Sequence, residues 1–200
     1  MRIEIRADTV RVDGYVNAVG RLSRQMTDED GIPFNEMVEP GAFMRALQAA
    51  GTISALLNHD WNRVLADTSG SLKLKEDTIG LYADFTSRDA ELISLAKDGK
   101  LRGWSFGFIP LDTKEEYTST GGHNITITEL DLKEVSVIDE RMIPVYSGTS
   151  ISTRAEAAGG GEKPILYRAM DGDIICRVVE PPDYSRYDEV INRLKKPNRV

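Results

Sequence analysis

Apolar and polar residues alternate in short runs along much of this chain, and this pattern limits the possible folds more than any other feature. Near the start, Ile3 and Ile5, and then Val10 and Val12, stand at every second position. A period of two places successive side chains on opposite faces of an extended strand, so that one face can be buried. Further strand-like runs are expected at 53–59, 71–75 and 80–86. The sequence therefore predicts a mainly β fold with flanking helices.

Turn and helix signals divide these runs. Asp13-Gly14 predicts the turn of an N-terminal hairpin, and Gly121-Gly122 predicts a turn between strands near 115–117 and 123–128. Helices are predicted from Pro40 to Gly51 and over 90–97, where Asp98-Gly99 supplies a stop. Beyond the second turn the apolar positions change parity, which predicts bulges or bends. They are Ile125 and Ile127, then Leu130 and Leu132, then Val135 and Val137.

The composition changes sharply after residue 154. Residues 155–163 are rich in Ala, Gly and Glu and contain too little apolar surface to pack, which predicts a flexible linker. We therefore expect a main domain at 1–154 and a C-terminal extension at 164–200. In the extension, Asp171-Gly172 predicts a hairpin, and residues 184–196 have helical spacing. A ββα unit of this size is marginal alone, so it is expected to dock on the main domain or on a second chain.

The net charge argues against two classes of partner. The chain has 25 Lys and Arg against 32 Asp and Glu, which gives a net charge of -7 and a pI near 5.0. Such a chain has no dominant affinity for nucleic acid or anionic lipid, so protein or peptide partners are expected. No apolar run approaches the roughly 20 residues of a membrane span, and the N-terminus does not resemble a signal peptide. We expect a cytoplasmic protein that has no contact with a membrane.

Few residues are suited to binding a metal or a cofactor. The single cysteine, Cys176, cannot form an intrachain disulfide, and its apolar surroundings in the sequence predict a buried side chain. With two histidines, His59 and His123, the chain lacks the clustered ligands of a zinc site. The acidic run 28–30 does not follow the spacing of a calcium loop. The sequence predicts no metal and no cofactor.

Ser105 is the candidate nucleophile. It lies in Gly103-Trp104-Ser105-Phe106-Gly107, which matches the Gly-x-Ser-x-Gly pattern of serine hydrolases, although glycine-rich strands also produce this pattern by chance. Trp104, Phe106 and Phe108 alternate with Ser105, so the aromatic side chains belong to one strand face, as core residues, and Ser105 to the other.

His59 is the candidate base, since a serine hydroxyl needs a base to become a good nucleophile. It precedes Ser105 by 46 residues, and a triad is defined by geometry and not by chain order. The alternative is a strand-end histidine that only hydrogen-bonds Asn58 or Asp60. His123 is more typical of a histidine in an exposed turn. The Ser, acid, His order and repeated βα units of the α/β-hydrolases are missing.

Several sequence blocks together resemble the prohead, or capsid-maturation, proteases of tailed bacteriophages, which are related to the herpesvirus assemblins. The resemblance spans roughly residues 12–145, and two of its blocks are centred on His59 and Ser105. The blocks are Glu39-Pro40-Gly41-Ala42-Phe43, Leu57-Asn58-His59-Asp60, Gly80-Leu81, residues 99–108, and Glu134-Val135-Ser136-Val137-Ile138.

The resemblance implies a serine endopeptidase with Ser105 as nucleophile and His59 as base. For the third member, the herpesvirus relatives use a second histidine and the phage relatives an acid after the serine. We prefer Glu134 to His123 because its block matches the family pattern. Glu134 would accept the other ring N–H of His59. Its alternative is a solvated strand carboxylate, and Asp60 and Asp131 are further candidates.

The resemblance also implies a fold, a set of partners and a location. The fold would be a closed or nearly closed, mainly antiparallel β-barrel with flanking helices. Substrates would be the major capsid protein, scaffold segments and the protease itself, inside the assembling prohead in the bacterial cytoplasm. A homodimer is implied, as is an oxyanion hole near Arg141.

The chain departs from the family at the charged residues 139–144 and in its extension. A catalytically inert scaffold protein and a serine esterase are the alternative functions.

Overall fold

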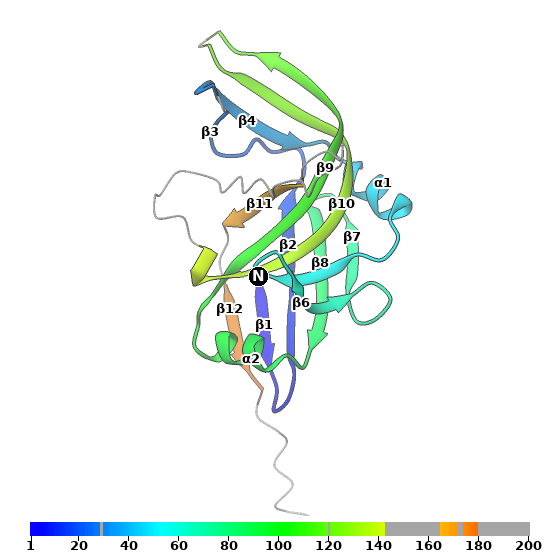
Figure 1. Ribbon diagram of the computed structural model, residues 1–200, viewed down its shortest axis with the longest axis vertical. Helices are drawn as coiled ribbons and strands as arrows, with labels where there is room; N and C mark the ends of the chain where they lie inside the picture. The colour runs from blue at the N-terminus through cyan, green and yellow to red at the C-terminus, as the bar shows by residue number, and fades with distance from the viewer. Residues whose placement is uncertain (29, 120, 143–164, 172–173, 180–200) are drawn as a thin grey trace, which may run out of the picture.

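A long, curved hairpin is the largest feature of the fold. The computed structural model describes residues 1–28, 30–119, 121–142, 165–171 and 174–179. In it, strands β9 (Leu101–Tyr117) and β10 (His123–Asp139) run antiparallel over nearly their whole length, and Figure 1 shows them curving through the molecule. The turn between them contains Gly121, whose φ is 86°. The hairpin predicted at Gly121-Gly122 is confirmed.

The curvature of this hairpin follows from breaks in its register. The pairing shifts between Ile127 and Leu130, between Leu132 and Glu134, and again after Ile138. The first two are the places where the apolar positions change parity in the sequence, and the third was not predicted. An extra residue in one strand bends that strand and increases its twist. The predicted bulges are confirmed, and they let the two ends of β10 pair with different strands.

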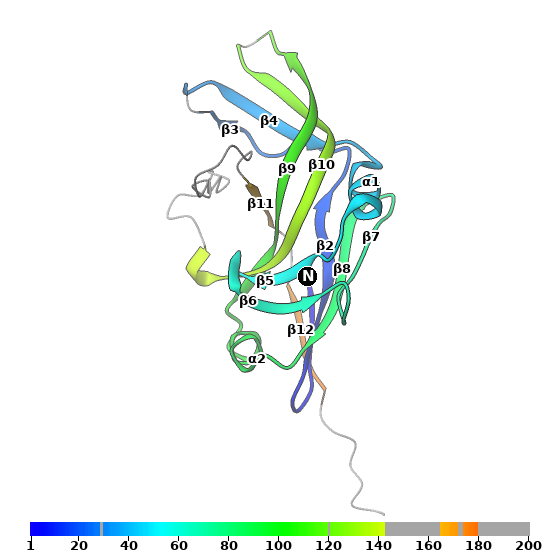
Figure 2. The ribbon, with the colours of Figure 1, turned by 45° about the vertical axis from the view of Figure 1, so that its right-hand side comes forward.

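Seven strands form the sheet that contains this hairpin, in the order β11-β9-β10-β4-β3, with β5 beside β10 and β6 beside β5. The C-terminal half of β10 pairs with β5 through Glu134 to Val137, and Figure 2 shows β5 beside this part of β10. The N-terminal half of β10 pairs with β4 through His123 to Ile127. The bounds of the other strands are β3 (Met26–Thr27), β4 (Pro33–Val38), β5 (Ser54–Leu57), β6 (Asp60–Asp67) and β11 (Leu166–Asp171).

Five further strands form a second sheet in the order β12-β1-β2-β8-β7. They are β1 (Arg2–Ile5), β2 (Val10–Ala18), β7 (Lys73–Glu76), β8 (Gly80–Ser87) and β12 (Ile175–Val178). No ladder joins the two sheets among the described strands, so the expectation of a closed barrel is wrong. Each sheet keeps free edges because the upper half of the hairpin extends away from the core. The prediction of a mainly β fold with flanking helices is confirmed.

The core lies between the two sheets. Val10, Val12 and Phe85 enter it from the five-stranded sheet, and Trp104 and Phe106 enter it from β9. The rings of Phe85 and Trp104 meet edge to face at 6.0 Å. Phe108 is buried as well, so the three alternating aromatic residues Trp104, Phe106 and Phe108 are all buried, as predicted.

The turn expected at Asp13-Gly14 is wrong, because both residues lie inside β2. The chain turns earlier, where the Arg6 amide donates to the Thr9 carbonyl at 2.9 Å. Gly14 is instead a point of close approach, since a Cβ there would lie 3.2 Å from Nε1 of Trp104. A glycine within a strand often marks such a contact, and the sequence pattern does not distinguish it from a turn.

Two helices flank the sheets in the described part of the chain, α1 (Ala42–Ala49) and α2 (Ala90–Lys97), and both were predicted. Neither has the length and apolar character needed to cross a bilayer. The Asp89 carboxylate caps α2 by accepting from the Leu92 amide at 2.7 Å. In α1, Phe43 packs edge to face on Phe106 at 5.3 Å. Helix α1 therefore supports the strand that carries Ser105.

The described part of the C-terminal extension enters both sheets. Strand β11 pairs antiparallel with β9, and β12 pairs in parallel with β1. The two strands belong to different sheets, so the hairpin predicted at Asp171-Gly172 is wrong, because each strand finds its hydrogen-bonding partner at an existing sheet edge. The predicted linker at 155–163 and the predicted helix at 184–196 lie outside the described residues.

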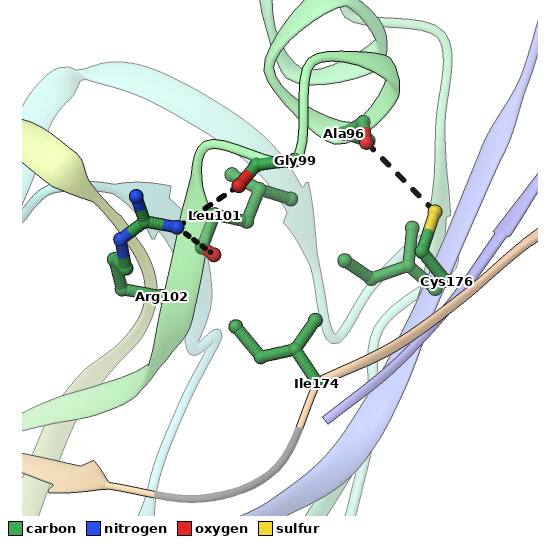
Figure 3. A pocket seen from close by; sticks show the side chains of 7 residues that line it. Ala96, Gly99, Leu101, Arg102, Ile174 and Cys176 are labelled. Atoms are coloured by element: carbon green, nitrogen blue, oxygen red, sulfur yellow. Dashed lines mark hydrogen bonds between the residues drawn. The ribbon is translucent and has the colours of Figure 1, made fainter.

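Cys176 is exposed, and the expectation that it is buried is wrong. The reason is that β12 is the outermost strand of its sheet, and its side chains remain exposed. Cys176 lines a hollow of about 220 Å³, and its Sγ is 3.8 Å from the Ala96 carbonyl oxygen. Figure 3 shows Cys176 among the other residues that line this hollow. Leu101 and Ile174 also line this hollow, whereas Ser105, His59 and Glu134 do not.

Glu76 of β7 caps α1 in place of a residue of the helix itself. Its two carboxylate oxygens accept from the amides of Gly41 and Met44, each at 2.6 Å. We expect Glu76→Ala to lower the free energy of unfolding by about 1–2 kcal/mol, because it leaves two helix amides without acceptors. Thermal denaturation checks this, with the exposed Glu116→Ala as control. Equal melting temperatures for the two variants would contradict the capping role.

Candidate active site

Ser105 lies in a row of residues that crosses four neighbouring strands, β5, β10, β9 and β11. Along this row Leu56 pairs with Ser136, Ser136 with Ser105, and Ser105 with Ala169. Directly opposed residues of a sheet project from the same face. Ser105 and Ser136 therefore share one face, and the buried aromatic residues of β9 occupy the other, as predicted. The Ser105 side chain is itself covered, with 1% of the residue exposed.

His59 follows β5 directly, in a two-residue turn that leads into β6. Asn58 and His59 have positive φ angles of 55° and 60°, as a type I′ turn requires. A non-glycine residue is strained in this region, so other contacts must hold it there. Three hydrogen bonds do so: Asn58 N to the Val137 carbonyl at 3.0 Å, the Asp139 amide to Asn58 Oδ1 at 3.0 Å, and His59 N to Ser136 Oγ at 3.2 Å. The turn is thus fastened to the end of β10.

The structure brings Glu134 and His59 together. Nδ1 of His59 lies 2.8 Å from Oε1 of Glu134, whose side chain is fully buried, and the hydroxyl of Ser136 donates to Oε2. An ionised carboxylate only accepts hydrogen bonds, so Nδ1 carries the proton and Nε2 is left with the lone pair of a base. The alternative of a solvated Glu134 is wrong, because no part of this side chain reaches solvent.

The other candidates for the third position lie elsewhere. His123 begins β10 at the opposite end of the hairpin, roughly 30 Å or more along the strand from Glu134, and it stacks on Phe34. Asp60 is the first residue of β6, and its carboxylate accepts a hydrogen bond from the Asn62 amide. Asp131 forms an ion pair with Lys133 at 2.6 Å. Of the candidates, only Glu134 contacts the ring of His59.

Two residues of this site were missed in the sequence. Ser136 bonds both Glu134 and the backbone of His59, and its position two residues after Glu134 on a strand could have placed it on the same face. Tyr167 of β11 lies against the His59 ring, with ring centroids 4.2 Å apart. Burial, with the Glu134 carboxylate as a second cause, raises the pKa of the Tyr167 hydroxyl. Nothing in the sequence pairs Tyr167 with a histidine more than one hundred residues earlier.

The Ser105 hydroxyl does not bond His59 in this structure. It donates instead to the carbonyl oxygen of Arg168, in β11, at 2.9 Å. The described residues thus supply a buried His–Glu pair, a serine on the same face of the sheet, and a peptide carbonyl already in contact with that serine.

The region expected to hold an oxyanion hole is occupied by an ion-pair network. The Arg141 amide donates to Oδ1 of Asp139 at 2.8 Å, so this amide is already used. Arg141 also reaches Glu91 at 2.9 Å, and Glu91 pairs with Arg63 of β6. Burial acts to raise the pKa of Asp139, but hydrogen bonds from Arg141 outweigh it and hold that pKa below its usual value. The network ties the end of β10 to the strand that follows His59.

The described residues contain no group of three or more His, Cys, Asp or Glu side chains placed to hold a metal ion. The side chains described above supply a hydroxyl, an imidazole and a carboxylate at this face.

Gly107, the last residue of the Gly-x-Ser-x-Gly block, leaves space for the His–Glu pair. A Cβ at this position would lie 2.6 Å from Oε1 of Glu134 and 2.8 Å from the Tyr167 ring. Gly107→Ala must therefore displace the oxygen that bonds His59. We expect it to weaken the contact between Glu134 and His59 and to reduce kcat/KM at least tenfold, since small displacements of reacting groups are costly. Activity assays check this against Gly51→Ala, where a Cβ meets nothing within 4 Å. A variant as active as the control would contradict this role.

Comparison with known proteins gives one match. Searches of curated proteins and of solved structures found no match. A family model described as caudovirus prohead serine protease matches residues 1–163, which is most of the chain and includes Ser105, His59 and Glu134. The chain therefore belongs to the caudovirus prohead serine protease family, a family of serine peptidases.

Proposed function

We propose that Ser105, His59 and Glu134 form the catalytic triad of an endopeptidase that matures phage proheads. The observation that carries this proposal is the buried contact between His59 Nδ1 and Glu134 Oε1 at 2.8 Å. A carboxylate in this position fixes the tautomer of the ring and stabilises the imidazolium that forms when the ring accepts a proton. Ser105 supplies the nucleophile on the same face of the sheet.

The proposed reaction has two halves. Nε2 of His59 accepts the proton of the Ser105 hydroxyl as Oγ attacks the peptide carbonyl, and the protonated ring then gives that proton to the leaving amine. Water hydrolyses the acyl-enzyme by the reverse sequence of proton transfers. For the first step the hydroxyl must leave the Arg168 carbonyl oxygen and hydrogen-bond the ring instead.

The proposed substrates are the major capsid protein, scaffold segments and the protease itself. Family membership supports the setting, an assembling prohead, and therefore supports capsid proteins as substrates. The contact between Ser105 and a peptide carbonyl of the same chain supports self-cleavage.

The decisive test is coexpression with the major capsid protein of the same phage. We expect wild type to shorten the capsid protein on a gel and Ser105→Ala to leave it intact, with little change in melting temperature, because one hydroxyl is removed. Ser94→Ala, exposed on α2, is the matched control and should cleave like wild type. Cleavage by Ser105→Ala would remove the nucleophile from the proposal. No cleavage by either protein would favour an inert scaffold protein.

A second test addresses Glu134. Glu134→Gln keeps the shape of the side chain but removes the charge that stabilises the imidazolium, so we expect kcat to fall by about 10³–10⁴-fold. Glu129→Gln, exposed on the same strand, is the control. Steady-state kinetics on a cleaved peptide measure both variants, and near-equal kcat values would show that Glu134 has a structural role only.

A further inference from the structure

Strand β11 occupies the free edge of the strand that carries Ser105. It pairs with β9 from Gly103 to Phe108, so its register is centred on Ser105, and Figure 1 shows it alongside the middle of β9. The family match ends at residue 163 and β11 begins at Leu166, so this strand lies outside the matched region. Peptides commonly bind proteins by adding a strand to such an edge. In this chain the added strand is its own.

The peptide bond after Arg168 is the one presented to the candidate nucleophile. The Ser105 hydroxyl lies 2.9 Å from the Arg168 carbonyl oxygen, and the next residue, Ala169, is opposite Ser105 in the register. On the other side of Arg168, the Tyr167 ring lies against His59. The chain on either side of this bond therefore contacts both the serine and the histidine.

The arginine side chain contacts two residues of the family-matched part of the chain, Glu36 and Phe108. Its Nε and its terminal Nη2 each donate to a different oxygen of Glu36 at 2.8 Å. The two side chains are 12% and 9% exposed, and the guanidinium lies over the Phe108 ring, 5.8 Å from its centroid. Bidentate, charge-assisted contacts of this kind recognise a guanidinium by its planar shape as well as its charge.

Glu36 lies within the family-matched part of the chain, whereas its cation comes from outside that part. It projects from β4, next to β10, and Arg168 is its ion-pair partner in the described structure. Glu36 accepts from two N–H groups of one guanidinium, so it gives the matched domain a site suited to an arginine side chain.

We propose that Glu36 determines the specificity of this peptidase. On this view, which rests on the proposed function, the substrate is a polypeptide strand that pairs antiparallel with β9, places an arginine against Glu36, and is cut after that arginine. The Arg168–Ala169 bond is the instance within the chain itself. In the reaction, Oγ of Ser105 bonds to the arginine carbonyl carbon as its proton passes to His59. The C–N bond then breaks and the Ala169 nitrogen takes that proton. Water releases the acyl group.

Self-cleavage of the full chain tests this proposal directly. Intact-mass measurement over time should show a fragment that ends at Arg168 and a peptide that begins at Ala169, and Ser105→Ala should show neither. We expect Glu36→Gln and Arg168→Gln to slow the cut at least tenfold and Arg168→Lys to slow it less. Glu39→Gln, half-buried just after β4 and paired with Arg45 and Lys114, should leave the rate within twofold of wild type.

A peptide assay separates recognition from folding. The probe is the hexapeptide of residues 165–170, compared with the same peptide carrying citrulline, the neutral isostere of arginine, in place of Arg168. The full chain should cut the arginine peptide on the order of 10²-fold faster, the loss expected when a buried charged pair becomes a neutral contact. In Glu36→Gln this ratio should fall to within about threefold. A variant that had merely lost stability would cut both peptides more slowly and keep the ratio.

The outcomes distinguish this proposal from the proposed function. If Ser105 is required for capsid cleavage but the two peptides are cut equally, or the chain is cut at a different bond, the specificity of Glu36 is overturned and the triad stands. If no Ser105-dependent cleavage of any polypeptide occurs, both proposals are overturned.

Discussion

The fully buried carboxylate of Glu134 is the constraint on which the rest of the site depends. A carboxylate removed from water needs hydrogen-bond donors at its oxygens, and the residues around Glu134 supply these donors and leave room for them. His59 donates to one oxygen and Ser136 to the other, while Gly107 lacks the Cβ that would collide with the first. The strained turn of Asn58 and His59 holds the donor in place through its bonds to β10. Loss of either donor would leave one oxygen of this buried carboxylate without a hydrogen-bond partner.

The bulged hairpin explains how residues from distant parts of the chain meet. Because the pairing of β10 with β9 shifts register near Glu134, the C-terminal half of β10 can pair with β5 while its N-terminal half pairs with β4. The first pairing delivers His59 at the end of β5, and the second places Glu36 near Phe108 of β9. Both the candidate triad and the Glu36–Arg168 contact therefore depend on the bulged strand β10, and the positions of its bulges set the distance between them.

Local patterns in the sequence predicted the parts of the structure that local chemistry decides. The alternation of aromatic residues in β9 predicted that Ser105 and Trp104 lie on opposite faces of the strand. The changes of parity among the apolar residues of β10 predicted its bulges. Gly14 and the 171–172 turn were misread because strand pairing with distant residues, and not the local turn signal, decides the conformation there. Glu134 was placed from a family resemblance, and its contact with His59 is present. Ser136, Tyr167 and Glu36 were missed because their roles exist only after β11, β10 and β4 come together.

The position of β11 has a consequence for the timing of proteolysis. One edge of a strand accepts one partner, so a foreign polypeptide can pair with this stretch of β9 only when β11 has left it. A strand that belongs to the same chain competes at an effective concentration that dilution does not lower. A dilute polypeptide would therefore lose this competition, whereas one held at high local concentration beside β9 would compete better. Local concentration, as well as sequence preference, would then affect when a foreign strand reaches this edge.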